Sequence, residues 1–392
     1  MTKSEKLVYE LSRNSFLSIW SYANPLNSQG KELCDVLVVC EPHIIIISVK
    51  EIEFKDTGRP EVDFERWRRS AIHESCKQLY GAQRKIDSQS NVITHNGKTA
   101  QPFPPKDTRN IFRIAVALGS NEKIPLTFGD FGKGFVHVFD EKSLQAVFSE
   151  LDTISDFLKY LLDKEQWLNS GKVSLFVGEE DLLAFYLSKD RVFPTEPSMV
   201  VLDEGLWKGF SQLPEVVSRK ENNKTSYYWD KILERFYENF SNDNYRTPWA
   251  TEVKELSELE FAVRAMAKEN RKMRCFLSES ILGLLNHTSL GARIFNVTES
   301  PVCYVFMTAN YAGDREINFK ELQARCLVAR GLDHSKQTVI GVLIERSSHY
   351  TDDAISLCYI NVLDWTEEWQ ERMDMYQNEL GFFRNKKRKS AS

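Results

Sequence analysis

No hydrophobic run in this 392-residue sequence is long enough to cross a membrane. A spanning helix needs about 20 consecutive apolar residues, whereas aliphatic stretches such as Ile44–Ile47 are far shorter. The opening residues 1–5 lead into an amphipathic helix and not into the apolar core of a signal peptide. We therefore expect a cytoplasmic protein without a membrane partner. Its composition, 42% hydrophobic and 27% charged, is that of an ordinary globular chain.

Several metal and nucleotide signatures are also absent. The seven cysteines include no Cys-x-x-Cys pair and lie mostly in apolar segments, which predicts buried free thiols and not a zinc site. Neither a His-Glu-x-x-His motif nor a Gly-x-Ser-x-Gly motif occurs. The segment Gly129–Gly134 lacks the spacing of a phosphate-binding loop and predicts a hairpin turn. The formal charge of −5 argues against a protein coated in nucleic acid but allows a local basic surface.

The length of the chain predicts two domains. A polar stretch with prolines at 190–225 is the expected border, which gives an N-terminal domain at 1–190 and a C-terminal domain at 200–382. Strands alternate with helices in both halves, so we expect an α/β fold: a mixed sheet flanked by helices, then an α/β domain rich in helix. The basic tail at 383–392 predicts disorder or an electrostatic aid to nucleic-acid binding.

The most informative feature of the N-terminal half is a predicted β-hairpin whose apolar strands carry an aspartate and a lysine. Residues 33–39 and 44–49 are nearly continuous apolar runs typical of strands covered on both faces, with a turn at 41–43 between them. Side chains alternate between faces along a strand, and directly opposed residues share a face. The pattern therefore places Asp35, Ser48 and Lys50 on one face, unless an odd-residue loop or a bulge reverses one strand.

The turn leaves two registers open. If Val39 opposes Ile44, then Asp35 opposes Ser48; if the pairing slides by two residues, Asp35 opposes Lys50. In either register an aspartate and a lysine meet at the end of a buried hairpin. This pair is the minimum for metal-assisted phosphodiester hydrolysis, because the carboxylate can bind Mg²⁺ and the ammonium can stabilise developing charge. The alternative is that both charges only reach solvent at strand ends.

These residues resemble the restriction-endonuclease-like nucleases, the superfamily described by the motif Pro-Asp…(Asp/Glu)-x-Lys. The resemblance covers roughly the first 90 residues and rests on Asp35, the apolar strand Ile44–Ile47, and Ser48-Val49-Lys50. Cys34 stands in place of the proline, and Ser48 stands in place of the second acid. The first helix, predicted at 3–20, contains Glu10 where many members carry a further acidic ligand.

The resemblance implies a nuclease that uses Mg²⁺ or Mn²⁺ to cut nucleic acid, DNA in the first place, in a setting such as restriction or phage defence. Asp35, Glu10 and the backbone carbonyl of Val49 would hold the metal, Lys50 would stabilise the attacking water or the transition state, and Ser48 would face the site. The alternative is a nuclease fold without catalysis that binds nucleic acid or assembles a complex. A protein partner or a homo-oligomer is compatible with both interpretations, and the C-terminal domain would recognise the substrate or the partner.

A predicted helix at 64–86 carries an excess of basic residues. The positions that could bind phosphates, or could equally form a solvated face, include Arg66, Arg69, Lys77 and Arg84. In some nucleases of the resembled type a polar residue on this helix supports the site, which makes Gln78 a further candidate. The following strands at 111–118 and 135–139 and a helix at 143–162 would complete the mixed sheet and its cover.

Overall fold

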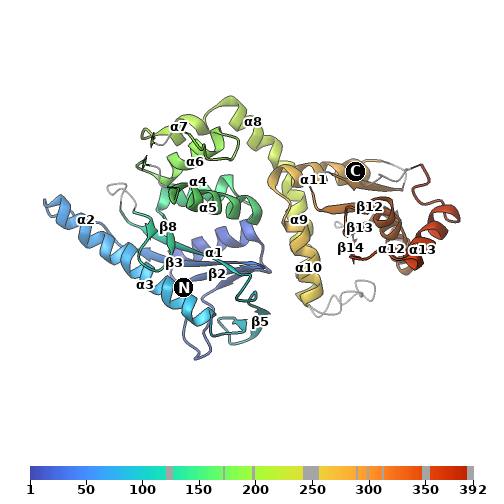
Figure 1. Cartoon of the computed structure of the whole chain (residues 1–392), viewed down its shortest axis with the longest axis horizontal. Coiled ribbons are helices and arrows are strands. Elements are labelled where there is room, and N and C mark those ends of the chain that lie inside the picture. The colour runs from blue at the N-terminus through green and yellow to red at the C-terminus, as the bar shows by residue number, and fades with distance from the viewer. Residues whose placement is uncertain are drawn as a thin grey trace. The chain divides into compact units, whose positions relative to one another are not determined.

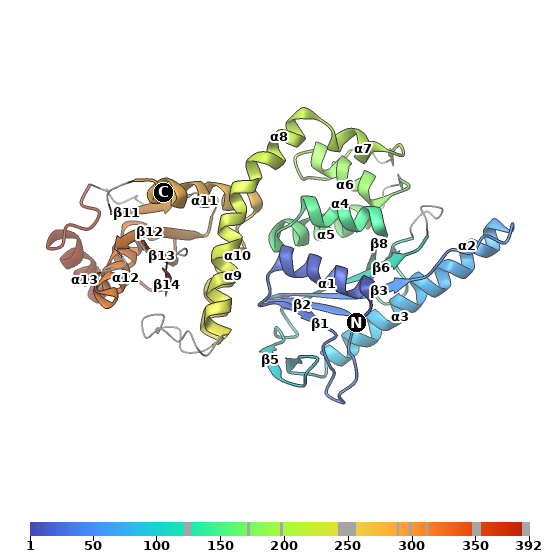
Figure 2. The ribbon, with the colours of Figure 1, turned by 180° about the vertical axis from the view of Figure 1, so that it is seen from behind.

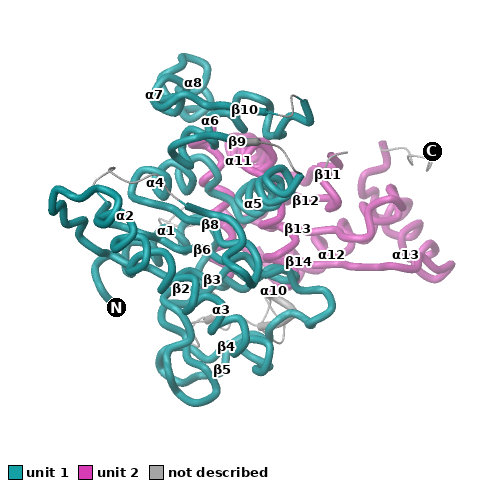
Figure 3. The backbone as a smooth tube through the Cα atoms, turned by 60° about the vertical axis from the view of Figure 1, so that its left-hand side comes forward, with its two compact units in different colours: residues 1–222 teal, residues 223–392 magenta. Residues whose placement is uncertain are grey.

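A computed structural model describes residues 1–120, 127–170, 173–196, 199–241, 256–287, 290–297, 300–310, 313–346 and 354–385. The chain forms two compact units, residues 1–222 and 223–392, which are distinguished by colour in Figure 3. Their border lies within the predicted interval of 190–225, and the first unit extends beyond the predicted limit at 190. Of the predicted basic tail, residues 386–392 lie outside the described residues.

The first unit alternates short strands with helices. In chain order its elements are α1 (Lys3–Phe16), β1 (Ser21–Ala23), β2 (Val36–Cys40), β3 (His43–Glu51), α2 (Pro60–Arg68), α3 (Glu74–Ile86), β4 (Asn91–Ile93), β5 (Thr99–Pro102), β6 (Asn110–Leu118), β7 (Gly129–Asp130), β8 (Phe135–Phe139), α4 (Glu141–Glu150), α5 (Ile154–Leu168), β9 (Val173–Leu175), α6 (Glu179–Ser188), β10 (Met199–Val201), α7 (Leu206–Ser211) and α8 (Pro214–Asn223). A π-helical turn, Arg69–His73, joins α2 to α3.

A six-stranded mixed sheet forms the centre of this unit, in the order β1-β2-β3-β6-β8-β7. Strands β1, β2 and β3 are antiparallel neighbours, β6 lies parallel to β3, and β8 lies parallel to β6. The parallel step from β3 to β6 requires a crossover, which the helical segment of α2 and α3 provides. The mixed α/β sheet flanked by helices expected from the sequence is therefore present.

Helices cover both faces of this sheet, with α1 on one side and α3 on the other (Figures 1 and 2). On the α3 side, Leu37 and Ile46 of the hairpin pack with Leu79 of α3 in one buried cluster. The alternate residues, such as Val38 and Ile45, are equally buried on the side of α1 and α4. Burial on both faces explains why the hairpin strands are nearly continuous apolar runs.

The observed register of the hairpin is one of the two alternatives. Cys40 pairs with His43 and Val39 pairs with Ile44, so that a two-residue turn joins the strands and the register slid by two residues is wrong. Continued by one step beyond Val36 and Ile47, this register places Asp35 opposite Ser48.

Two predicted helices differ from the structure. The helix predicted at 3–20 ends at Phe16, because Leu17 adopts a left-handed φ of 73°. The helix predicted at 143–162 is two helices, α4 and α5, since Thr153 begins a new helix by accepting a hydrogen bond from the backbone N–H of Asp156 at 3.1 Å. The helix predicted at 64–86 starts earlier, at Pro60, and includes the π-helical turn.

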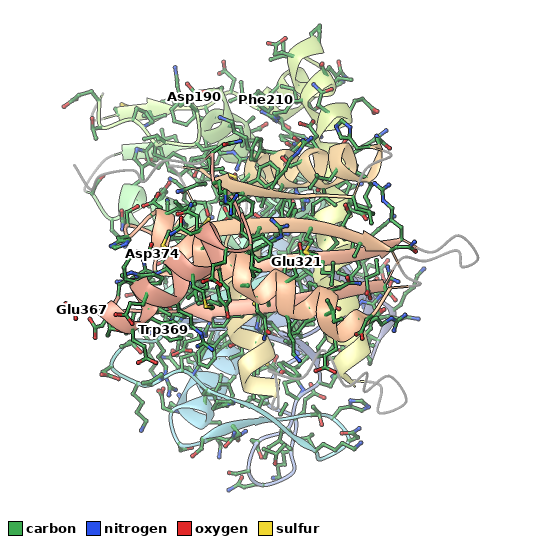
Figure 4. The ribbon with its side chains drawn as sticks, turned by 90° about the vertical axis from the view of Figure 1, so that its right-hand side faces the viewer. Asp190, Phe210, Glu321, Glu367, Trp369 and Asp374 are labelled. Atoms are coloured by element: carbon green, nitrogen blue, oxygen red, sulfur yellow. The ribbon has the colours of Figure 1, made fainter. Side chains whose placement is uncertain are left out.

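The second unit is also α/β with a large helical share. Its elements are α9 (Tyr227–Ser241), α10 (Leu256–Ala267), α11 (Arg271–Leu285), β11 (Ala292–Asn296), β12 (Val302–Asn310), α12 (Arg315–Leu332), β13 (Thr338–Arg346), β14 (Ala354–Asn361) and α13 (Glu367–Asn378). Its sheet has the order β11-β12-β13-β14, with only β12 and β13 parallel. Helix α12 connects these two strands and contacts α13; Figure 4 labels Glu321 on α12 and Trp369 on α13.

Among the described residues, no helix is both long and apolar enough to cross a bilayer. The described cysteines are free, and all except Cys275 are buried.

Candidate functional site

A cavity of about 530 Å³ lies where the start of β2, the end of β3 and the middle of α3 meet. It is lined by residues of the loop before β2, of the hairpin and of α3: Asn27, Glu32, Leu33, Cys34, Asp35, Ser48, Gln78, Leu79, Gly81, Ala82, Arg84 and Lys85. The cavity is therefore on the α3 side of the sheet and includes the aspartate and the serine that the sequence singled out.

Asp35 is a buried acid at the edge of this cavity, 9% exposed. Its Oδ2 accepts a hydrogen bond from the backbone N–H of Val49 at 2.5 Å, which fixes the carboxylate against β3. Burial raises the pKa of Asp35 to about 6; the Val49 hydrogen bond opposes this rise, and the nearby carboxylates of Glu5 and Glu32 add to it. The site thus holds an acid whose charged form is disfavoured as long as no cation is present.

Glu32 and Glu5 are the acidic residues that approach Asp35, and sequence reasoning did not select either of them as a ligand. Glu32 is exposed, lies three residues before Asp35 and lines the same cavity. Glu5 caps the start of α1, where its carboxylate accepts a hydrogen bond from the backbone N–H of Thr2 at 2.8 Å. The sequence could have indicated Glu32, because it lies three residues before Asp35. It could not have indicated Glu5, because the position of Glu5 depends on how α1 packs.

Ser48 is fully enclosed and bonded to α3. It is 2% exposed, and its Oγ donates a hydrogen bond to Gln78 Oε1 at 2.9 Å. The structure therefore brings Ser48 and Gln78, two of the predicted site residues, into direct contact. At the position where the resembled motif has its second acid, this chain has a neutral pair of hydroxyl and amide.

Lys50 lies two residues further along β3, on the same face and half-buried. It is close to Glu74 of α3: the pKa of this exposed acid is held low first by the hydrogen bond from Lys77 and then also by the charge of Lys50. Glu74 and Gln78 are one turn apart on α3, so Lys50 and Ser48 face successive turns of one helix. Lys50 itself does not line the cavity of about 530 Å³.

Glu10 is not brought to this cavity. It lies on α1, which covers the other face of the sheet, and its half-exposed carboxylate is 3.9 Å from Lys6 Nζ. Glu51 also belongs to that other face, since its carboxylate accepts a hydrogen bond from Ser4 of α1. The predicted metal-ligand role of Glu10 therefore lacks geometric support.

Of the residues predicted to contact nucleic acid, some line the cavity and others lie outside it. Gln78 and Arg84 line the cavity, together with Lys85, another basic residue of the same predicted helix. Arg66 is tied to Asp63 at 2.7 Å and lies outside the cavity. The two remaining candidates are exposed away from the cavity lining: Arg69 and Lys77.

The donor set fits one hard divalent cation with few protein ligands. In the part of the chain that the structure describes, no cluster of three or more histidine, cysteine, aspartate or glutamate side chains is placed to hold a metal. Mg²⁺, however, usually keeps several waters and takes only one or two carboxylates. Asp35 and Glu32 could supply these carboxylates. The pKa of Asp35 is raised first by burial and then by the charges of Glu5 and Glu32, and a bound cation would favour its charged form. Because the N–H and C=O of one strand residue point to the same side, the Val49 carbonyl points to the edge of β3 at which Asp35 accepts the Val49 N–H.

Comparison of the sequence with protein-family models and with curated proteins, and of the structure with solved structures, found no match.

Proposed function

We propose that the first unit is a metal-dependent nuclease of the restriction-endonuclease-like type. The observation that carries this proposal is the cavity in which the buried carboxylate of Asp35 and the carboxylate of Glu32 meet Ser48, with Lys50 on the same face of β3. The architecture supports it: a helix precedes the hairpin of Asp35 and Ser48-Val49-Lys50, and this hairpin lies in a mixed sheet flanked by helices.

In this proposal the cation is held by Asp35 and Glu32, with Val49 contributing its carbonyl oxygen. A bound Mg²⁺ or Mn²⁺ supplies Lewis acidity, since it polarises the phosphate and lowers the pKa of a bound water. The Val49 N–H holds one oxygen of Asp35 in place and leaves the other oxygen for the ligand. Lys50 adds positive charge beside the reacting phosphate, and the cations of Arg84 and Lys85 on the cavity wall attract the neighbouring phosphates of the strand.

The alternative is that the unit binds nucleic acid without cutting it. The hydrogen bond between Ser48 and Gln78 favours this alternative, because it places a neutral pair where the resembled motif has a carboxylate. DNA is the proposed nucleic acid, restriction or phage defence the proposed setting, and the second unit the proposed module for recognising the substrate or a partner.

A cleavage assay with the full chain tests the proposal. Labelled single- and double-stranded DNA and RNA are incubated with Mg²⁺, with Mn²⁺ or with a chelator. We expect cleavage that needs the cation and falls at least about 100-fold in Asp35→Asn and in Lys50→Met, since each loss corresponds to roughly 3 kcal/mol of transition-state stabilisation. Glu32→Gln should mainly raise the concentration of metal that is needed.

Glu61→Gln is the matched control, because Glu61 is an exposed carboxylate at the start of α2 and outside the cavity. It should cut like the wild type. Binding of nucleic acid without cleavage under any metal would favour the alternative, whereas wild-type rates in both Asp35→Asn and Lys50→Met would refute the nuclease site.

A further inference from the structure

A second cavity, of about 350 Å³, lies on the first unit beside the start of β6. Its lining comes from the end of α3, the start of β6 and the loop before it, and α5: Gln83, Asp87, Lys106, Arg109, Asn110, Ile111, Phe112, Arg113, Leu162 and Glu165. It shares no lining residue with the candidate nuclease cavity.

The two cavities lie towards opposite ends of the parallel pair β3 and β6. Ser48 of the first cavity pairs with Ala115, whereas Asn110 of the second cavity pairs with His43. Five residues of strand separate these two levels, which corresponds to roughly 17 Å. The second cavity is therefore not an extension of the metal-binding position proposed above.

The charge of the second cavity is positive. Its lining carries three basic side chains, Lys106, Arg109 and Arg113, and two acidic ones, Asp87 and Glu165. One acid is already engaged: Glu165 Oε1 lies 2.9 Å from Nε2 of His137. His137 is buried and its pKa is lowered, first by burial and then by the charges of Lys164 and Arg113, so the neutral ring donates Nε2–H to the carboxylate.

Arg109 is the side chain that most clearly lacks a ligand. It is 8% exposed, and its Nε has no hydrogen-bond partner among the described residues. Its Nη1 makes only long contacts of 3.5 Å, to Asp87 Oδ1 and to the Ile86 carbonyl. A buried guanidinium N–H without an acceptor is costly, and an anionic oxygen in the cavity would remove that cost.

Arg113 is the fixed counterpart on the strand. Its Nε and Nη2 both donate to Gln83 Oε1, at 2.7 and 2.5 Å, and its Nη1 donates to the Phe135 carbonyl at 3.2 Å. The guanidinium is thus held in place before any ligand arrives. Such preorganisation lowers the entropic cost of binding.

The wall beside these cations is apolar, formed by Ile111, Phe112 and Leu162. A cavity with arginines on one side and an aromatic and aliphatic wall on the other matches a nucleotide better than a bare anion, because the phosphate and the base have different requirements. We infer that this cavity binds a nucleotide through its phosphate, with Arg109 and Lys106 on the phosphate and the base against the partly exposed apolar side chains Ile111 and Leu162. The nucleotide can be free or can be the 5′-phosphorylated end of a strand.

Calorimetric titration of the full chain, without divalent metal, tests this inference. The probes are AMP, adenosine, inorganic phosphate, and a short oligonucleotide with or without a 5′-phosphate. AMP should bind with a stoichiometry of one, and both adenosine and phosphate should bind more weakly. Arg109→Gln should weaken AMP binding about tenfold or more, since it removes a charge-assisted contact. Lys106→Gln, at an exposed position, should weaken it severalfold without changing the melting temperature.

Arg13→Gln is the control, because Arg13 is an exposed arginine on α1. The oligonucleotides distinguish a free nucleotide from the 5′-phosphorylated end of a strand as the ligand. If the 5′-phosphorylated strand binds more tightly than AMP, the cavity is assigned to strand ends. If AMP binds more tightly, the cavity is assigned to free nucleotides. Equal affinity for AMP and phosphate, or AMP binding that neither Lys106→Gln nor Arg109→Gln changes, would overturn the inference. Cleavage is not measured, so these outcomes are independent of the nuclease proposal.

Discussion

Replacing Asp35 by asparagine should stabilise the protein at neutral pH, although it removes the acid on which the nuclease proposal depends. Asp35 is 9% exposed, and its carboxylate is close to those of Glu5 and Glu32. An asparagine has nearly the same shape and keeps an oxygen to accept the hydrogen bond of the Val49 N–H. The variant therefore removes a charge without removing the contact that positions the side chain.

The size of the effect follows from the pKa of Asp35. It is about 6 in the folded protein, against about 3.9 in an unfolded chain. Because the folded pKa is raised, the folded state binds the proton more tightly, so stability is lost as the pH rises through this interval. Below about pH 3 both states are protonated and nothing is lost, and near pH 4 the loss is still well under about 1 kcal/mol. Above about pH 7 the loss is complete and amounts to about 3 kcal/mol.

Urea unfolding of wild type and Asp35→Asn at several pH values measures this difference. We expect the variant to be more stable by up to about 3 kcal/mol at pH 8 and nearly equal to the wild type near pH 4. Added Mg²⁺ should stabilise the wild type by mass action and leave the variant unchanged. The control Glu61→Gln should show no comparable pH dependence, because Glu61 is exposed. A variant that is less stable at pH 8, or a difference that persists at pH 4, would refute the reasoning.

Two further predictions test the environment of buried polar groups. Ser48→Glu places a third carboxylate near Asp35, so without metal it should cost several kcal/mol in urea unfolding, and Mg²⁺ should reverse much of this loss if the metal site is real; a loss that metal does not reverse would remove Ser48 from the site. Lys164→Met removes the cation 2.5 Å from the buried Glu179, whose carboxylate then keeps the hydrogen bond from the Tyr160 hydroxyl, and it should cost about 3–5 kcal/mol. Lys159→Met, which breaks a half-exposed pair, should cost at most about 1 kcal/mol. Equal effects of the two lysine substitutions would contradict the burial argument.

The sequence by itself determined the central hairpin and the face that carries its polar residues. Apolar runs separated by a short turn allow only antiparallel pairing of neighbours, and the alternation of side chains then places Ser48 and Lys50 together. These features are local: they depend on chain direction and on a period of two, both of which can be counted in the sequence. The exact register was not determined, because two turn lengths fitted the same pattern.

Helix ends were predicted less well than helix positions. Leu17 ends α1 by adopting a left-handed conformation that is uncommon for leucine, and nothing in the pattern of apolar residues marks it. The break between α4 and α5 does have a local signal, the cap formed by Thr153 and Asp156, but the apolar periodicity continues across it. A prediction based on periodicity alone therefore joined two helices.

Only the tertiary structure decided which acid of α1 lies near Asp35. Glu10 and Glu5 lie on the same helix. The packing of α1 brings the charge of Glu5 close enough to act on Asp35, whereas Glu10 pairs with Lys6 one turn earlier on α1. The second cavity has the same origin, because Arg109 on the chain before β6 and Glu165 on α5 meet only once β6 has joined the sheet. Contacts between segments distant in sequence depend on how layers pack, and no period within one segment encodes that packing.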